Sequence, residues 1–369
     1  MEVFRLRPRI IQVEVSTKCQ LKCGFCPRTL FKESWRSEDI SWEHFVRILP
    51  YAGKVELVHL QGWGEPLLHP GIWKMATAIK EKGGRISMTT NGMLMDDAAV
   101  RQICEIGFSF IAVSMAGARA GTHDSLRIGS SFGRICENVS RLSAAKSHPG
   151  IHLVMQMMKP NIDELPELVD LAAELGADSV IAPNLDYTPV ARMEDLKVFA
   201  RIRDTRLGDV VEEAVIRGKK HGIGVRTYPV EPDDNCPVCS DDPLNNVVIN
   251  VRGEVAPCVY LSMPVEGDIP RMYWGEHSRV SPFTYGNVKN GLRQTLESAQ
   301  AKKFRKEFER RVEYTRLDAI KSMSLLTLPG IRNVRGILQR SKGHGLISAS
   351  TAIPPAPAQC RGCYKLQGI

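Results

Sequence analysis

Short apolar runs of strand character alternate with amphipathic helical stretches along the first half of the chain. The strand-like runs cover residues 11–17, 55–60, 85–91, 110–116, 151–158 and 179–183. Between them, helical spacing of apolar residues predicts helices at about 41–50, 71–82, 96–106, 132–146 and 163–176. This alternation indicates βαβ units with right-handed crossovers and a parallel sheet. Six such units are too few to close an ordinary eight-stranded α/β barrel.

Three cysteines follow the first strand in the spacing C-x3-C-x2-C, as Cys19, Cys23 and Cys26. Clustered thiolates are soft ligands that select zinc, Cu(I) or iron–sulfur clusters. A closed zinc site takes a fourth ligand, but the next histidine is His44 and the next cysteine is Cys104. Three ligands on a four-iron cluster would leave one iron open for an exogenous group.

This spacing, with Phe25 directly before the third cysteine, resembles the signature of the radical S-adenosylmethionine (SAM) enzymes. The resemblance implies a partial (β/α)6 barrel similar to a TIM barrel, with chemistry at the C-terminal ends of the strands. It also implies that Cys19, Cys23 and Cys26 hold a 4Fe–4S cluster whose open iron binds SAM. An electron from that cluster would cleave SAM to methionine and a 5′-deoxyadenosyl radical, which takes hydrogen from a substrate. An unrelated zinc loop is the alternative.

The segment after the second strand is Gly62-Trp63-Gly64-Glu65-Pro66. It resembles the glycine–glycine–glutamate–proline segment of the same family, which implies that Gly62, Gly64 and Glu65 hold the methionine amino group of SAM. Glycines allow close backbone approach. Trp63 departs from the glycine often found in the middle, and a plain turn is the alternative.

The third and fourth strands also end in family-like segments. Thr89 and Asn91 lie where the family places hydroxyl and amide groups near the cofactor. Ser114 begins Ser-Met-Ala-Gly, which resembles the family's Ser-x-Asp-Gly near the ribose, although Ala116 replaces the carboxylate. The resemblance covers about residues 8–185.

The remaining cysteines fall into two groups. Cys104 and Cys136 stand among apolar residues at helical spacing, and buried free cysteine behaves as a small hydrophobe. The others lie in turn-forming surroundings: Cys236, Cys239, Cys258, Cys360 and Cys363. Two C-x2-C pairs and a single cysteine could form one zinc site of ribbon type.

A second interpretation of these cysteines starts from a predicted β-hairpin at 245–258, with its turn at Arg252-Gly253. The spacing C-x13-G-x4-C, Gly286-Asn287 and a helical stretch at 291–310 resemble the SPASM or twitch extension of radical SAM enzymes. A full SPASM set has seven cysteines, so the five here imply one auxiliary 4Fe–4S cluster. Its ligands would be Cys239, Cys258, Cys360 and Cys363, while Cys236 falls outside the family spacing and its role is uncertain.

These patterns predict two domains, a barrel at 1–230 and an auxiliary-cluster domain at 231–369, the latter a small hairpin-plus-helix unit. An insertion at about 311–359 is basic, with six basic residues and one acid between 316 and 342. It could be a lid, a docking face, a peripheral membrane contact or a solvated amphipathic segment.

Composition bounds the functional class of the chain. The 369 residues are 43% hydrophobic and 24% charged, as in globular enzymes. No apolar run is long enough for a transmembrane helix, and the N-terminus is too short and charged for a secretory signal. Ten cysteines without an export signal indicate a reducing, cytoplasmic location. The net charge of +8 favours acidic partners, but no basic–aromatic stripe indicates a nucleic-acid site.

We therefore expect a radical SAM enzyme that oxidises or modifies a small-molecule or cofactor precursor, or a protein partner, with electrons from a ferredoxin or flavodoxin. About ten residues precede the first strand, which favours a substrate without a leader peptide. GWGEPLLHP also resembles proteins that mature the cofactor of tungsten-dependent aldehyde oxidoreductases. The alternatives are a maturase of ribosomally made peptides and a non-catalytic zinc or iron–sulfur scaffold. Iron and sulfide content would separate the enzyme from the scaffold.

Overall fold

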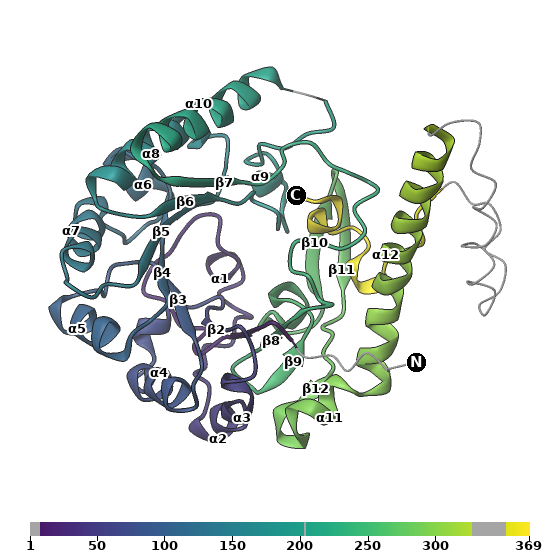
Figure 1. Cartoon of the computed structure of the whole chain (residues 1–369), viewed down its shortest axis with the longest axis horizontal. Helices are drawn as coiled ribbons and strands as arrows, with labels where there is room; N and C mark the ends of the chain where they lie inside the picture. Colours follow the sequence, from purple (N-terminus) through teal and green to yellow (C-terminus); the bar gives the residue numbers. More distant parts are fainter. Residues whose placement is uncertain (1–7, 203, 327–351) are drawn as a thin grey trace.

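The computed structural model describes residues 8–202, 204–326 and 352–369, with side chains up to 317 in the long C-terminal helix. The first six strands are parallel and neighbours in chain order, and they form an open ring with helices on its outer side (Figure 1). Their bounds are β1 Ile10–Val13, β2 Leu57–Leu60, β3 Ile86–Thr90, β4 Phe110–Met115, β5 Gly150–Met155 and β6 Ser179–Ala182. The six predicted strands and the partial-barrel fold are thus confirmed.

The outer helices cover one face of the sheet. They include α4 Ile72–Glu81, α5 Asp97–Ile106, α6 Ala120–Leu126, α7 Phe132–Ser143 and α8 Leu165–Glu174. In α5, Asp96 accepts a hydrogen bond from the Ala99 N–H at the start, and Gly107 ends the helix with φ +75°. The predicted helix at 41–50 is instead two short helices, α2 Trp42–Val46 and α3 Leu49–Ala52. Pro50 lies in the first turn of α3, where its missing N–H costs no hydrogen bond.

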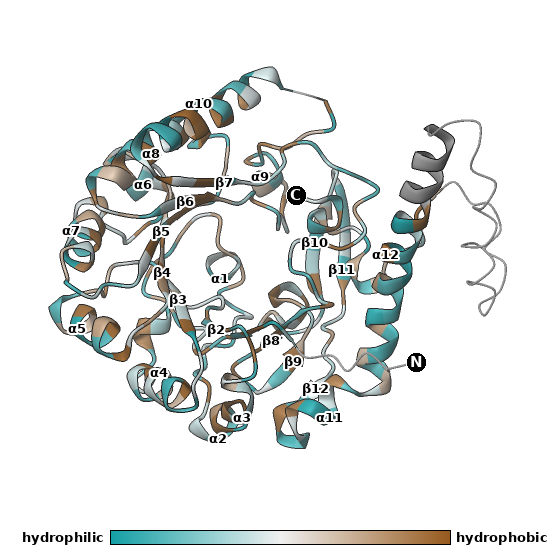
Figure 2. Cartoon of the chain, in the orientation of Figure 1, coloured by the Kyte–Doolittle hydropathy of each residue, from teal (hydrophilic) through white to brown (hydrophobic). Residues whose placement is uncertain are grey.

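Successive residues of each strand point to opposite faces of the sheet. Ile11, Val13, Val58 and Leu60 are fully buried in the core between the sheet and the helices. Figure 2 shows this hydrophobic layer in brown along the strands and the helix sides that face them. The alternate positions face into the ring and include polar pairs.

His59 is one of these inward residues, and its Nδ1 lies 2.7 Å from the Ser87 hydroxyl. His152 lies 2.7 Å from the Ser179 hydroxyl in the same way. Burial lowers the pKa of His59 to about 4, so that imidazole is neutral near pH 7. The inside of the ring is therefore polar and holds hydrogen-bonding groups.

Two parallel strands extend the sheet beyond the prediction. α10 Thr205–His221 leads to β7 Gly224–Thr227, which pairs with β6, and β8 Asn246–Ile249 pairs in parallel with β1. The predicted hairpin is β8 and β9 Glu254–Ala256, with Gly253 at φ +75° in its turn. The hairpin thus continues the barrel sheet, which the sequence did not indicate.

The C-terminal part adds a second hairpin, β10 Ile269–Tyr273 and β11 Glu276–Val280, and a short strand, β12 Gly286–Asn287, paired with β9. The predicted helix at 291–310 is two helices, α11 Leu292–Leu296 and α12 Ala299–Leu326. Figure 1 shows β10, β11 and α12 on the open side of the ring, between β7 and β8. Among the described residues no helix has the length and apolarity needed to cross a membrane.

The predicted insertion at 311–359 is described only in part. It begins inside α12, and residues 327–351 lie outside the described residues. The proposed lid, docking face or membrane contact therefore stays a prediction.

Candidate functional site

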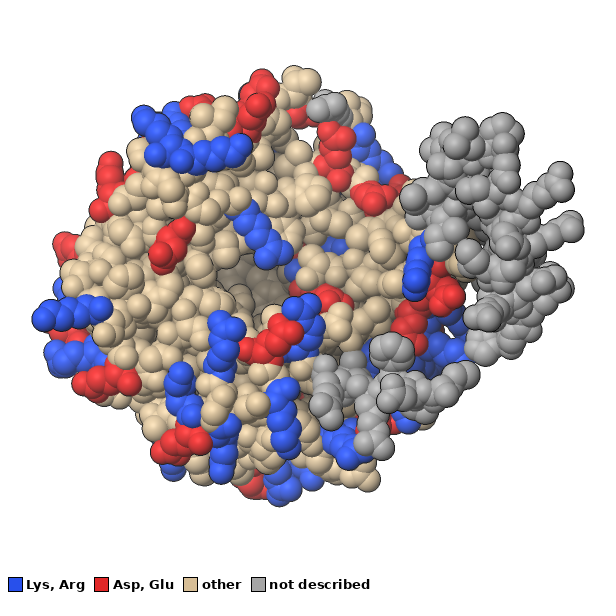
Figure 3. Space-filling model, viewed as in Figure 1, with Lys and Arg blue, Asp and Glu red and all other residues tan. Residues whose placement is uncertain are grey.

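The three N-terminal cysteines lie on the loop that leaves β1 and leads to α1 Pro27–Leu30, which Figure 1 shows within the ring. All three are free thiols; Cys23 is buried and the other two are partly buried. Burial, and then the neighbouring Cys23 and Cys19 groups, raise the pKa of Cys26 to about 11. The Cys26 N–H donates to the Cys23 carbonyl at 3.1 Å, so the loop turns between these two cysteines. Figure 3 shows a hollow in the centre of this face, with both basic and acidic side chains at its rim.

The two glycines after β2 support this loop. A Cβ on Gly64 would lie 2.3 Å from the Ser16 carbonyl oxygen and 2.5 Å from that of Lys18, and a Cβ on Gly62 would lie 2.2 Å from Glu14 Cγ. The Glu65 N–H also donates to the Lys18 carbonyl at 2.7 Å. The close backbone approach expected of these glycines is therefore an approach to the cysteine loop.

Glu65 is 2% exposed and joins the segments after β2 and β3. Its Oε1 accepts from the Thr90 hydroxyl at 2.7 Å and the Leu67 N–H at 3.1 Å, and its Oε2 accepts from the Asn91 N–H at 2.7 Å. Burial raises its pKa, which these hydrogen bonds counteract. A carboxylate has about four acceptor positions, so one on Oε2 is left for a ligand.

Asn91 connects Glu65 to the cysteine loop. Its Nδ2 lies 3.7 Å from Cys19 Sγ and donates to the Gln20 side chain at 3.2 Å. Thr89 lies on the inward face of β3, where its hydroxyl is 3.1 Å from His59 Nε2.

Ser114 and Phe25 complete the predicted set. Ser114 lies near the end of β4, opposite Val154 of β5. Phe25 packs against the cluster of Met158, Leu185 and Met193, which anchors the cysteine loop to segments after β5 and β6. The structure thus brings Cys19, Glu65 and Asn91 together, while the cofactor contacts of the predicted set stay predictions.

Arg127, which the sequence reasoning missed, follows α6 and is 9% exposed. Its Nε has no hydrogen-bond partner, and it forms no ion pair with the described residues. Its charge lowers the pKa of Glu65, which places the guanidinium within electrostatic range of that carboxylate. A buried donor without a hydrogen-bond partner is costly, and the Arg127 Nε is such a donor, so this position suits an anionic ligand group. Nothing in the local sequence distinguishes it from an exposed arginine.

Four C-terminal cysteines form a second group. Burial and the neighbouring groups, including Cys360, Cys258 and Cys363, raise the pKa of Cys239. Burial raises that of Cys258 to about 12, with Asp241 and Cys363 adding to it. All four are free and partly buried, and they come from three segments separated in the chain.

Cys236 points elsewhere. Its Sγ donates to the Val238 carbonyl at 3.1 Å. Burial raises the pKa of Cys236, and the charged groups that act on it are Asp233 and Arg311, not the other cysteines. Arg311 of α12 holds this segment by donating to the carbonyls of Cys236 at 2.7 Å and Pro237 at 3.1 Å, and also to that of Pro354. One helix thereby ties together the chain near Cys239 and the chain leading to Cys360.

The C-terminal part rests on the loops at the C-terminal ends of the strands. The Trp63 ring, after β2, lies 5.6 Å from that of Tyr260, and its Nε1 donates to the Val259 carbonyl at 3.3 Å. After β6, Asp186 accepts from the Tyr260 hydroxyl at 2.6 Å. Trp63, which departs from the family's glycine, thus joins the loop after β2 to the segment that follows Cys258.

Both thiol sets have the ligand chemistry of iron–sulfur clusters, which are held by cysteine thiolates. One set has three thiols and the other has four, and neither includes a disulfide. Within the described part of the chain, no three His, Cys, Asp or Glu side chains converge on a position for a single metal ion. The residues present therefore fit clusters by their donor type.

Comparison with known proteins agrees with this chemistry. The model of the radical SAM superfamily matches residues 13–178, and the model of the SPASM iron–sulfur cluster-binding domain matches residues 236–317. The chain is 25% identical over 291 residues to the tungsten-containing aldehyde ferredoxin oxidoreductase cofactor-modifying protein of Pyrococcus furiosus, covering 76% of this chain and 78% of that protein. It is 24% identical over 186 residues to the PqqA peptide cyclase of Rhodopseudomonas palustris, covering 49% of this chain and 48% of that protein.

Among solved structures, the fold is similar to that of Streptococcus suis SuiB bound to S-adenosylmethionine. The TM-score is 0.60 at 18% identity, over 81% of this chain and 68% of that chain. The match spans the ring and the C-terminal part together. The chain therefore belongs to the radical SAM superfamily and carries a C-terminal SPASM domain.

Proposed function

We propose that this radical SAM enzyme is a maturase that oxidises a cofactor precursor. The observation that carries this proposal is the presence of two separate all-thiol sets in one chain. Cys19, Cys23 and Cys26 would hold the cluster that binds SAM, and Cys239, Cys258, Cys360 and Cys363 would hold one auxiliary cluster. With SAM bound, the reduced first cluster supplies the electron that cleaves SAM to a radical able to take hydrogen from substrate.

The chain's own residues would bind and orient SAM. Arg127 offers a charged donor group for the methionine carboxylate, and charge-assisted hydrogen bonds are the strong ones. The open acceptor position on Glu65 Oε2 suits the methionine ammonium. Asn91, whose N–H donates to Glu65, would keep the Glu65 carboxylate in place beside Cys19. Ser114 and Thr89 face the ring, where the ribose would lie.

The auxiliary set supports an oxidative outcome. A substrate radical that loses one electron and one proton becomes a closed-shell product, and a nearby cluster can take that electron. The barrel would end near residue 230, where the auxiliary domain begins. The two units share one sheet, because β8 of the second unit pairs with β1 of the first.

The relatives support the proposed substrate class. The match over 291 residues is to a cofactor-modifying protein, which favours a cofactor precursor. The similarity to a peptide cyclase and to SuiB supports a peptide as the second candidate. Electrons would come from a ferredoxin or flavodoxin, and the positive net charge suits such acidic donors.

The test is SAM cleavage by the anaerobically reconstituted, reduced full chain, measured as 5′-deoxyadenosine. We expect cleavage, and a faster rate with the low-molecular-mass fraction of a cell extract than with its peptide fraction. Faster cleavage with the peptide fraction would favour the peptide alternative. Iron-loaded protein that forms no 5′-deoxyadenosine would contradict the proposal.

A further inference from the structure

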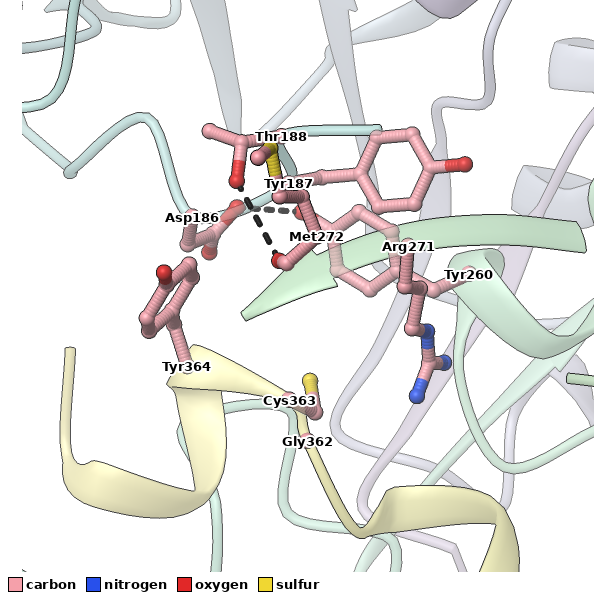
Figure 4. A pocket seen from close by; sticks show the side chains of 9 residues that line it. All are labelled: Asp186, Tyr187, Thr188, Tyr260, Arg271, Met272, Gly362, Cys363 and Tyr364. Carbon is pink, nitrogen blue, oxygen red and sulfur yellow. Dashed lines mark hydrogen bonds between the residues drawn. The ribbon is translucent and has the colours of Figure 1, made fainter. Parts of the chain in front are cut away.

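A buried arginine lies beside the second thiol set. Arg271 is on β10, where strand alternation places it on the same face as the fully buried Ile269, and it is itself 5% exposed. Its Nη1 donates to the carbonyl of Gln359, directly before Cys360, at 2.9 Å. Figure 4 shows Arg271 and Cys363 lining one pocket. The guanidinium is therefore held beside the segment that carries Cys360 and Cys363.

No carboxylate among the described residues pairs with Arg271. Lys365, a second buried cation nearby, does have carboxylate partners: it lies 3.2 Å from Asp186 and 2.9 Å from Asp241. Burying an unpaired guanidinium costs several kcal/mol unless an anion offsets it. Asp186 lines the same pocket as Arg271 but is paired with Lys365, so within the described part of the chain Arg271 has no carboxylate partner of its own.

The proposed cluster ligands are the groups that lie beside Arg271. Cys363 lines the same pocket, and Cys360 directly follows the residue whose carbonyl accepts the Arg271 hydrogen bond. Two of the four proposed ligands are thus next to one buried cation. A four-iron cluster held by four thiolates is itself an anion, and its charge grows by one on reduction.

We propose that Arg271 compensates the charge of the auxiliary cluster and raises its reduction potential, so that the cluster accepts an electron from the substrate radical. This inference rests on the auxiliary cluster of the proposed function. In this step the substrate radical would lose one electron to the oxidised cluster and one proton to solvent, and would leave as a closed-shell product. Net charge and hydrogen bonding around a cluster set its potential. Arg271 is a positioning residue, because it acts through the cluster.

The test uses the full chain in which Cys19, Cys23 and Cys26 are replaced by Ala, so that only the auxiliary cluster is observed. Arg271→Gln removes the charge, and Arg271→Lys keeps it. Arg279→Gln is the matched control, since Arg279 is exposed on β11 of the same hairpin. The measurements are iron content and the midpoint potential, from an anaerobic redox titration followed by electron paramagnetic resonance.

We expect Arg271→Gln to keep its iron and to shift the midpoint to a more negative potential. Arg271→Lys should stay close to the parent, and Arg279→Gln should match it. Loss of iron in Arg271→Gln but not in Arg271→Lys would also support a charge requirement. An unchanged midpoint in Arg271→Gln, or loss of iron in both variants, would overturn the inference. A parent without iron would instead contradict the auxiliary cluster itself.

Discussion

At the scale of single residues, buried charges define the proposed SAM site. Arg127 and Glu65 are both nine-tenths or more buried, and each affects the pKa of a neighbour. Glu65 is held by three hydrogen bonds from the protein, whereas the Arg127 Nε has no partner. Arg127 is therefore the residue whose environment a bound anion would change most.

Replacing Arg127 by Gln should weaken SAM binding about 10- to 100-fold, because a hydrogen bond to a charged group contributes about 1.5–3 kcal/mol. Equilibrium dialysis with the iron-loaded protein measures the Kd. Arg134→Gln, at an exposed position of α7, is the control and should bind as the parent does. A Kd unchanged in Arg127→Gln would remove Arg127 from the SAM site.

Cys236 and Cys239 allow a second comparison between two variants. Cys239→Ala should lose the auxiliary cluster, because its thiol lies with those of Cys258, Cys360 and Cys363. Cys236→Ala should keep it, since that thiol donates to the Val238 carbonyl instead. Iron analysis of both variants checks this, and the opposite pattern would show that the ligand assignment is wrong.

The sequence alone predicted the site residues that lie close together in a recognisable motif. Cys19, Cys23 and Cys26 lie within eight positions, so the motif is visible without a fold. Arg127 was missed because its signal is a buried guanidinium with an unpartnered Nε, which only tertiary structure provides. The role of Gly64 was anticipated as close approach, but its contact, the carbonyl of Ser16, could not be read from the chain.

At the scale of elements, the loop after β2 supports the cysteine loop after β1. Gly64→Ala should displace that loop, since the added Cβ would lie 2.3 Å from the Ser16 carbonyl oxygen. We expect the variant to lose the N-terminal cluster and retain the auxiliary one, which halves the iron content. Gly208→Ala, on α10 and away from both cysteine sets, is the control, because a Cβ there meets nothing within 4 Å. Full iron in Gly64→Ala would contradict this packing role.

Glu14, at the end of β1, joins the β2 loop and the β8–β9 turn. Its carboxylate accepts from the Trp63 N–H at 2.9 Å, and burial raises its pKa to about 7. The folded protein therefore holds a proton that the unfolded chain releases above its ordinary pKa of 4.5. Stability from this group is full below that value and falls by about 3 kcal/mol as pH rises to the folded pKa.

Glu14→Gln should remove this dependence. Its melting temperature should match that of the parent near pH 4 and exceed it at about pH 7.5. Glu56→Gln, at an exposed carboxylate, should differ little from the parent at both values. If the Glu14 variant kept the parent's pH profile, the buried carboxylate would not be the titrating group.

Local pattern predicted the strands and most helices because each depends on periodicity within a few residues. It did not predict that β8 pairs with β1, since that contact joins segments more than 200 residues apart in the sequence. β7 was missed because only four residues form it and two of them are exposed.

At the scale of the whole molecule, the auxiliary unit lies against the loops that leave the barrel strands. Trp63 after β2 contacts the Val259 segment, and Asp186 after β6 contacts Tyr260. The auxiliary unit and the barrel are therefore joined by packed side chains at the ends of the barrel strands.

The central claim is that one chain holds two separate four-iron clusters, of which only the first depends on the N-terminal cysteines. Iron and sulfide per chain, with Mössbauer spectra, test it in the parent and in the variant with Cys19, Cys23 and Cys26 replaced by Ala. We predict about eight irons in the parent and about four in the variant, all in clusters of the 4Fe–4S type. A variant that held zinc and no iron, or as much iron as the parent, would contradict the claim.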